Sequence, residues 1–202
     1  MNIEYYINQV WTGKFALPVA ITLLALIIIL ILNWRKLRHQ WLEWNTRRSL
    51  NAIGIKQMKD VVCSDGLDGK FKIDRLVMLH DSILLIAFKP YSGNIYCADS
   101  IPEWTQVVGQ KSFKFSNPLF ELENQITAIQ GIAQKVPVRG VLFFDHNAKF
   151  PKGHPDKVLN PDNIPDYMIR VNCPEPSREI VQCWQMLLGL AKQVNQSVRL
   201  QK

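Results

Sequence analysis

The chain has 202 residues, of which 48% are hydrophobic, and a formal net charge of +7. This length is enough for one soluble domain of ordinary size once a membrane segment is set aside. The four cysteines contain no C-x-x-C pair and no spacing with the four histidines that is typical of zinc sites. The composition therefore favours reduced thiols over a disulfide framework or a zinc site.

An uncharged apolar run extends from Phe15 to Leu32, eighteen residues in all. At about 1.5 Å per residue such a run spans roughly 27 Å, close to the hydrocarbon thickness of a bilayer. We therefore expect a transmembrane helix over residues 15–34, preceded by a short extracytoplasmic tail over 1–14. A cleaved signal peptide is the alternative, and Glu4 before the run and the lack of an A-x-A site after it argue against cleavage.

Five of the six Lys and Arg residues between positions 1 and 48 follow the apolar run. This bias predicts a single-pass protein of the inner (plasma) membrane, with its N-terminus outside and its C-terminal domain in the cytoplasm. Residues 35–62 are expected to form a basic juxtamembrane helix or linker, and both a headgroup-level and a solvated position stay open. The cytoplasmic domain is expected over 63–202 and is only mildly basic.

The segment from Lys72 to Gly93 predicts two apolar strands joined by a tight turn at residues 80–82, because β-branched and aliphatic residues surround a polar pair. Asp74 falls on the first strand. Ala87 and Lys89 fall on the second strand and, being two residues apart, point to the same face. A carboxylate facing a small-x-Lys sequence outlines a metal-dependent phosphodiester-cutting site. The position expected to carry its second acid is Ala87.

The rest of the domain alternates between strand and helix patterns. We expect a turn at 64–70, where Asp65 and Asp68 precede glycines, and a third strand of a meander at 94–98. Residues 103–115 fit neither period and are expected to form a loop or short strand, with Lys111 and Lys114 as candidate phosphate contacts. A helix should begin at Pro118, with Asn117 as its N-cap, and lead by a crossover into a buried strand at 138–144.

The C-terminal quarter is predicted to be irregular over 145–166, followed by a short strand at 167–171 and a final helix capped by Ser177. Asp145, His146 and His154 allow a metal or general-base interpretation, but a surface loop is the simpler one. The order of elements predicts an α/β fold with a mixed sheet flanked by helices, preceded by the transmembrane helix.

Several blocks resemble one family in the right order: D-G-L-D-G-K-F-K-I-D-R-L, I-L-L-I-A-F-K-P-Y-S-G-N-I, W-T-Q and F-S-N-P-L. Over about residues 48–150 the chain resembles the NERD domain, the nuclease-related domain of bacterial and archaeal proteins. The resemblance implies a restriction-endonuclease-like core, related to the PD-(D/E)XK nucleases, and a role in DNA processing.

In such nucleases an Asp and an acid two residues before a Lys hold Mg²⁺, which polarises the scissile phosphate and activates water. The resemblance assigns Asp74 to the first acid, Lys89 to the Lys and Ala87 to the missing acid. The superfamily often supplies a further Glu from the helix before the first strand, and none occurs between Asn45 and Val62. Asp74 alone is a poor Mg²⁺ site, so we expect no metal unless the protein is active.

The first hypothesis is accordingly a membrane-anchored NERD-domain protein with a remnant site at Asp74 and Lys89, which binds nucleic acid or protein and does not cut. An active endonuclease with a relocated acid, from Glu121 or Asp65, is one alternative. A scaffold in a membrane protein complex, with no nucleic acid partner, is the other. The expected partners are the lipid bilayer, DNA and other proteins of a membrane complex.

Overall fold

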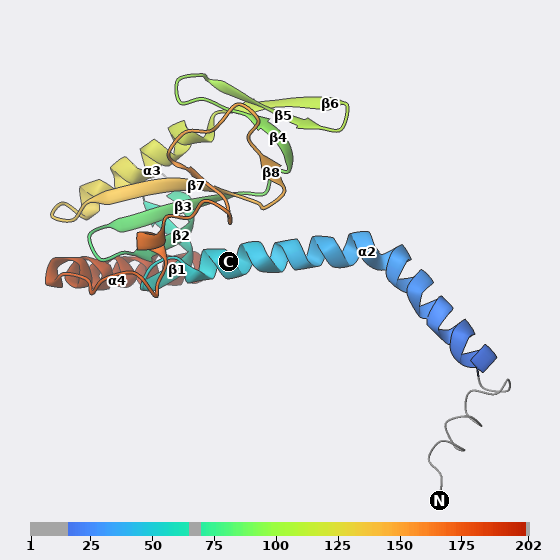
Figure 1. The fold of residues 1–202 in the computed structure, drawn as a ribbon. Helices are drawn as coiled ribbons and strands as arrows, with labels where there is room; N and C mark the ends of the chain where they lie inside the picture. Colours follow the sequence, from blue (N-terminus) through green and yellow to red (C-terminus); the bar gives the residue numbers. More distant parts are fainter. Residues whose placement is uncertain (1–15, 65–69, 201–202) are drawn as a thin grey trace, which may run out of the picture. The chain divides into compact units, whose positions relative to one another are not determined.

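The computed structural model describes residues 16–64 and 70–200, which form a mixed α/β fold with two mixed sheets flanked by helices (Figure 1). The chain divides into two compact units, residues 1–42 and 43–202, and every strand belongs to the second. Helix α2 spans Ala16–Ala52, and its large apolar side chains from Val19 to Leu32 are exposed.

The apolar part of α2 has too little apolar length to cross a bilayer as a single helix by itself. Within the described residues no single helix has both the length and the apolar composition that crossing requires. The segments Pro18–Trp34 and Lys36–Ala52, bent by 54° relative to each other, meet the requirement only as a pair. The expected tail over 1–14 lies outside the described residues, and the transmembrane helix stays a prediction.

A five-stranded sheet forms the centre of the second unit. Its strand order is β1 (Lys56–Ser64), β2 (Lys70–Met78), β3 (Ile83–Lys89), β7 (Val138–Phe144) and β9 (Val158–Leu159). The first three strands are antiparallel, and β3, β7 and β9 run parallel. The predicted tight turn is confirmed, with the Leu79 N–H donating to the Ser82 carbonyl at 3.0 Å.

The expected helix or linker over 35–62 is wrong for its last part, because α2 ends at Ala52 and β1 begins at Lys56. Gly54 makes this change of direction: its φ of +66° is a conformation that glycine adopts without strain, and its N–H donates to the Met168 carbonyl at 2.7 Å. The compact unit begins at Glu43 and not at residue 63. The turn that contains Asp65 and Asp68 lies outside the described residues.

The second sheet has the order β6 (Lys111–Ser116), β5 (Glu103–Val108), β4 (Gly93–Tyr96) and β8 (Ala148–Lys149). The prediction that β4 continues the meander is wrong, since the chain turns at Gly93, with φ +83°, into this other sheet. The segment expected to be a loop or short strand is the β5–β6 hairpin, drawn at the top of Figure 1.

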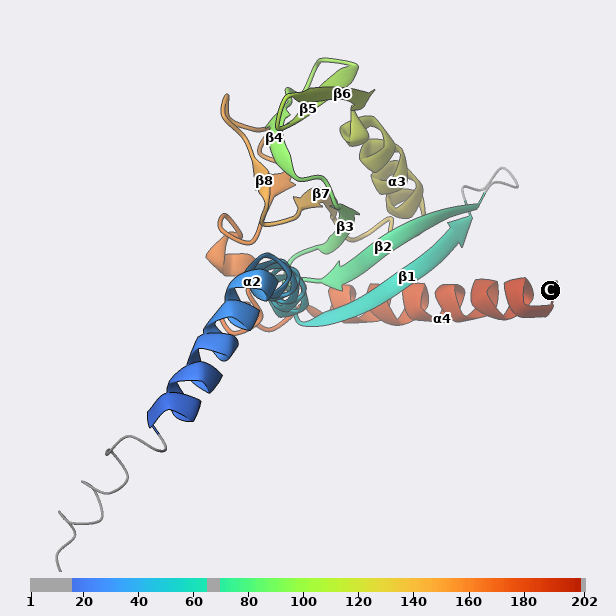
Figure 2. The ribbon, with the colours of Figure 1, turned by 90° about the vertical axis from the view of Figure 1, so that its right-hand side faces the viewer.

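Two long helices complete the domain. Helix α3 (Pro118–Ile132) is the predicted crossover, and the Asn117 side chain accepts from the Leu119 N–H at 2.9 Å. Helix α4 (Arg178–Leu200) lies beside β1 (Figure 2). The short strand expected at 167–171 is wrong: the 3-10 helix η1 (Asp166–Met168) stands there, followed by one bridge between Ile53 and Ile169.

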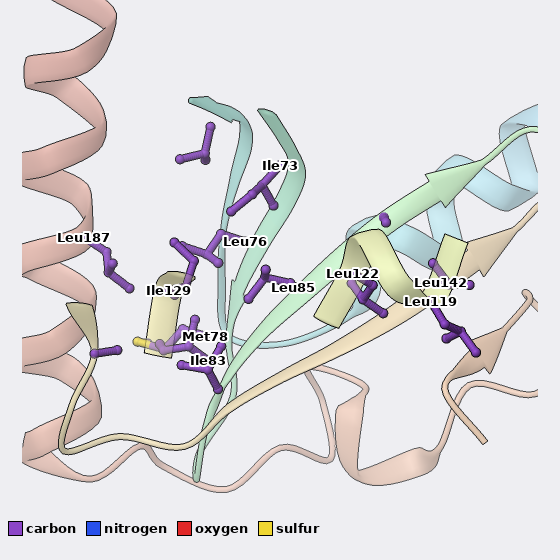
Figure 3. Packing of buried hydrophobic residues seen from close by; sticks show 14 of the residues in the cluster. Ile73, Leu76, Met78, Ile83, Leu85, Leu119, Leu122, Ile129, Leu142 and Leu187 are labelled. Carbon is purple, nitrogen blue, oxygen red and sulfur yellow. The ribbon is translucent and has the colours of Figure 1, made fainter. Parts of the chain in front are cut away.

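The central sheet has an apolar cluster on each side. One cluster combines Leu85 of β3 with Ile129 of α3 and Leu187 of α4, whose side chains converge in Figure 3. The other combines Leu84 and Ile86 of β3 with residues that include Leu50, Ile53 and Met168. Strand β3 is therefore buried on both sides, which explains its nearly continuous apolar sequence.

Candidate functional site

A cleft of about 610 Å³ opens beside the sheet and is the candidate site. Its walls come from the last turns of α2, from β1 and β2, from the end of β3 and the residue after it, and from the residue that follows β7. The lining residues are Glu43, Thr46, Arg47, Leu50, Asn51, Lys59, Asp60, Asp74, Arg75, Phe88, Pro90 and Asp145. Four of them are acidic and three are basic, so the cleft has mixed charge.

Asp74 lies where the pairing of β2 with β3 stops. The register continues only as far as the pair Arg75–Ile86, one residue short of Asp74. Beyond that point the Asp74 Oδ2 accepts a hydrogen bond from the Phe88 backbone N–H at 2.8 Å. One carboxylate oxygen therefore replaces a strand carbonyl as the partner of that N–H, and the side chain is fixed at the edge of the cleft.

Ala87 and Lys89 do not line this cleft. Ala87 belongs to the apolar cluster on the side of α3 and α4 and is 9% exposed. The Lys89 Nζ lies 3.4 Å from the Glu121 Oε2 of α3. Ala87 and Lys89 share a face as expected, but this face is directed toward α3, and it is Phe88 and Pro90 that line the cleft with Asp74.

Glu43 was not predicted from the sequence, because it lies two residues before the segment 45–62 in which a helical Glu was expected. Glu43 lines the cleft together with Thr46, Arg47 and Leu50 of the same helix. These positions are spaced at three, four and seven residues, the pattern of a single helix face, which is the signal that could have found it. The buried Thr46 hydroxyl donates to the Asp145 Oδ1 at 2.9 Å and joins this face to the end of β7.

Arg75 is a basic residue of the cleft that is held by two side-chain hydrogen bonds. Its Nη1 donates to the Asn51 Oδ1 at 2.7 Å and to the Gln57 Oε1 at 3.0 Å. Burial lowers the pKa of the Arg75 guanidinium, and the charges of Asp60 and Asp74 oppose this effect. An arginine remains cationic at neutral pH after such a shift, so Arg75 supplies a fixed positive charge one residue from Asp74.

Asp60 is the acid at the outer rim of the cleft. Its φ of +52° is unusual for a residue other than glycine, and its carboxylate forms an ion pair with Lys72 across the β1–β2 hairpin. A hydrogen bond from Lys72, followed by the charge of Lys72, lowers the pKa of Asp60. Asp60 is therefore engaged with β2 at the surface.

The residues present do not fit the Mg²⁺ site that the resemblance implies. Mg²⁺ requires a set of fixed oxygen ligands in near-octahedral geometry. One Asp74 oxygen is occupied by the Phe88 N–H, and Ala87 contributes no oxygen. Within residues 16–64 and 70–200, no three His, Cys, Asp or Glu side chains are grouped so that they could hold a metal ion. Glu121 contacts Lys89 and does not line the cleft, while Asp65 lies outside the described residues.

The remaining candidates lie away from Asp74 or have structural contacts. Lys111 and Lys114 stand on β6 of the second sheet, where Lys114 pairs with Glu103 at 3.3 Å. His154 packs its ring against Phe150 and contacts the Pro155 carbonyl through Nδ1 at 3.0 Å. The His146 Nδ1 lies 3.5 Å from the Asp162 Oδ1, beyond the range of a good hydrogen bond. The four cysteines carry free thiols.

A family model, NERD, described as nuclease-related domain, matches residues 38–145. The match covers more than half of the chain and extends from the helix that carries Glu43 to Asp145, so it includes every residue that lines the cleft. It begins ten residues earlier than the expected boundary at 48. Searches among curated proteins and among solved structures find no match. The chain belongs to the NERD, nuclease-related domain, family.

Proposed function

We propose that this NERD protein is anchored in a membrane by its N-terminal helix and carries a cytoplasmic, restriction-endonuclease-like module that binds nucleic acid without cleaving it. The observation that supports the proposal is the surroundings of two residues of strand β3, Ala87 and Lys89. Where an active site would present an acid and a lysine, Ala87 lies in an apolar cluster and Lys89 pairs with Glu121. Lost cleavage follows, because neither side chain acts on a phosphate bound beside Asp74.

The order of the elements supports a nuclease-like core. Along the chain, the end of α2 is followed by the antiparallel strands β1 to β3 and, after strands β4 to β6 of the second sheet, by helix α3 and the parallel strand β7. A mixed sheet of this kind, with a helix crossover between two parallel strands, is what the resemblance to the PD-(D/E)XK nucleases implied. This likeness concerns the fold, and the binding function is argued from a surface.

The β5–β6 hairpin is the surface that we assign to nucleic acid. Phe113 is 50% exposed and stands two residues from Lys111 on the same face of β6. An exposed aromatic ring beside a cation suits stacking on a base together with contact to the adjacent phosphate. The mixed charge of the cleft makes it a weaker candidate than the hairpin for sequence-independent binding to a polyanion.

The membrane anchor is supported by the exposed apolar side chains of α2 and by the charges that follow them. Between Val19 and Leu32 the large apolar side chains are close to half exposed or more, which is unusual in water. The five basic residues after this segment favour a cytoplasmic domain. The bilayer would cover the apolar surface and would be the first partner of the protein.

Binding is tested with the full-length chain and a fluorescent single-stranded oligonucleotide, by electrophoretic mobility shift at two salt concentrations. We expect a shift that weakens with salt. In K111Q the slope of the logarithm of the binding constant against the logarithm of the salt concentration should fall by about one, because one phosphate contact is lost. F113A should weaken binding by about 1–3 kcal/mol. Lys135, an exposed lysine after α3, provides the matched control K135Q, which should bind like wild type. No shift at low salt would overturn nucleic-acid binding and favour a protein partner.

An active endonuclease is the second candidate, and one observation favours it: Glu43, Asp74 and Asp145 line the same cleft. The acid missing from β3 would then be replaced from α2, and not from Glu121 or Asp65, the two positions expected from the sequence. Divalent-metal-dependent cleavage that disappears in both E43Q and D74N would establish this candidate in place of the first.

A further inference from the structure

Four side chains meet at the end of the sheet where β2 turns into β3, and none of them lines the cleft. We call this group the turn cluster: His80 and Asp81 of the turn, Arg139 of β7 and Cys173 of the segment before α4. The Cys173 Sγ lies 3.9 Å from the His80 Nδ1, within hydrogen-bond range for sulfur. The same nitrogen lies 3.9 Å from the Asp81 Oδ1.

An ion pair and two hydrogen bonds hold the turn cluster in place. The Arg139 Nη2 lies 3.0 Å from the Asp81 Oδ2, and the Ser82 hydroxyl donates to the Asp81 Oδ1 at 2.8 Å. The Ser177 N–H donates to the His80 carbonyl at 3.4 Å, which ties the segment after Cys173 to the turn. One imidazole nitrogen, Nδ1, therefore lies near both the Cys173 thiol and the Asp81 carboxylate, whose charge is offset by the Arg139 guanidinium.

Cys173 differs from the other three cysteines in its surroundings. Burial raises the pKa of the Cys63 and Cys183 thiols. Burial, together with the charge of Asp99, raises the pKa of the Cys97 thiol to about 11. A thiol held in this way is almost fully protonated at neutral pH and reacts slowly, because the thiolate is the nucleophile.

We propose that Cys173 is a modification site, the thiol of this chain that reacts with hydrogen peroxide, and that His80 is the base that accepts its proton. In the step, the S–H proton passes to the His80 Nδ1 and the thiolate attacks one peroxide oxygen. The S–O bond forms as the O–O bond breaks, and the leaving hydroxide takes a proton from the imidazolium to give water. Sulfur is oxidised to sulfenic acid and the peroxide is reduced.

Oxidation at this position would place a larger, polar group against the β2–β3 turn. The Cys173 side chain is partly buried against the apolar cluster that contains Leu84 and Met168. Its modification therefore disturbs the side of the sheet against which the end of α2 packs. The proposal is independent of nucleic-acid binding and does not rest on the proposed function.

The test treats the full-length chain with hydrogen peroxide at pH 7, traps sulfenic acid with dimedone and measures each cysteine peptide by mass spectrometry over time. Cys173 should be labelled at least about tenfold faster than Cys63, Cys97 or Cys183, since its thiol contacts the His80 imidazole, whereas burial raises the pKa of the other three. The three other cysteines are internal controls in the same sample, so this comparison needs no variant. Equal rates at all four cysteines would overturn the proposal.

Substitution of His80 tests whether Cys173 reacts because a base lies next to it or only because its thiol is exposed. H80Q should lower the labelling rate of Cys173 by about tenfold and leave the other three rates unchanged. H154Q removes a histidine that contacts the Pro155 carbonyl and the Asn163 side chain, and Cys173 in this variant should be labelled as fast as in wild type. D81N gives a second variant in case H80Q does not fold, and it should slow labelling of Cys173 as well. A Cys173 rate unchanged in folded H80Q would contradict the role of the base.

Discussion

The Asp74 carboxylate and the Phe88 backbone N–H form a 2.8 Å hydrogen bond at the point where β2 and β3 separate. This contact gives Asp74 a structural task besides any role in the cleft. The D74A variant leaves the N–H without its partner and should reduce the free energy of unfolding by about 1–2 kcal/mol. In D74N the amide oxygen can still accept this bond, so the loss should be smaller. Urea unfolding of both variants measures the difference, and equal losses would show that the bond contributes nothing.

Substitution of Ala87 by an acid tests whether the remaining metal ligands of a nuclease site are still in place. In A87E a carboxylate enters an apolar cluster, so we expect a loss of about 2 kcal/mol or more in the free energy of unfolding. A87Q has nearly the same size without the charge and should lose less. Titration calorimetry with Mg²⁺ should detect no binding to A87E. Tight Mg²⁺ binding by this variant would instead show that the other ligands are already in place.

The Asp60–Lys72 ion pair predicts a dependence of stability on pH. The pair lowers the pKa of Asp60 from 3.8 and raises that of Lys72 from 10.5. The Asp60 contribution is therefore present above the unfolded-state pKa and is lost as the pH falls through the lower folded-state pKa. The Lys72 contribution is present below its unfolded-state pKa and is lost as the pH rises through the higher folded-state pKa.

Wild type should accordingly melt at a slightly higher temperature than K72M between about pH 4 and pH 10, and the two should converge outside this range. The difference should be small, because the pair is on the surface and screened by solvent. Thermal unfolding across the pH range measures it. A difference that persists at pH 2 would assign the effect of K72M to lost packing and not to charge.

The proposal that the protein is anchored in a membrane rests on the apolar part of α2. Arginine at Leu24 and at Ile28 should each cost about 2.5–3.5 kcal/mol of insertion free energy, so the double variant L24R/I28R should leave the membrane fraction. Extraction of membranes with alkaline carbonate, followed by immunoblotting, measures this release. L190R changes an exposed leucine of α4 and should stay with the membrane. Retention of the double variant would contradict anchoring by this segment.

Much of the fold could be predicted where local pattern and burial agree. The 138–144 strand and the start of α3 at Pro118 were both correct, because an unbroken apolar run and an Asn-Pro cap are strong local signals. Strand β4 was assigned to the wrong sheet. Its pairing depends on Gly93, where a positive φ redirects the chain, and on partners more than 50 residues later in β8. Sequence periodicity contains no information about such distant pairing.

The candidate site was predicted less completely than the fold. Asp74 could be singled out because it stands within a recognisable strand, and it lines the cleft, while its role there stays a prediction. The alternation rule correctly put Ala87 and Lys89 on one face, but it could not show that this face is directed toward α3. Glu43 was missed because the helical pattern of α2 includes both the apolar segment and the first residues of the domain, so the pattern does not mark where the domain begins.

The central claim, a nuclease-like module that does not cut, is tested most directly by cleavage of labelled DNA. The full-length chain is incubated with single- and double-stranded DNA in Mg²⁺ or Mn²⁺, and the products are separated on a denaturing gel beside the D74N and K89A variants. We predict intact DNA in every lane, including lanes in which wild type binds the DNA. Metal-dependent products from wild type that disappear in D74N and K89A would contradict the account.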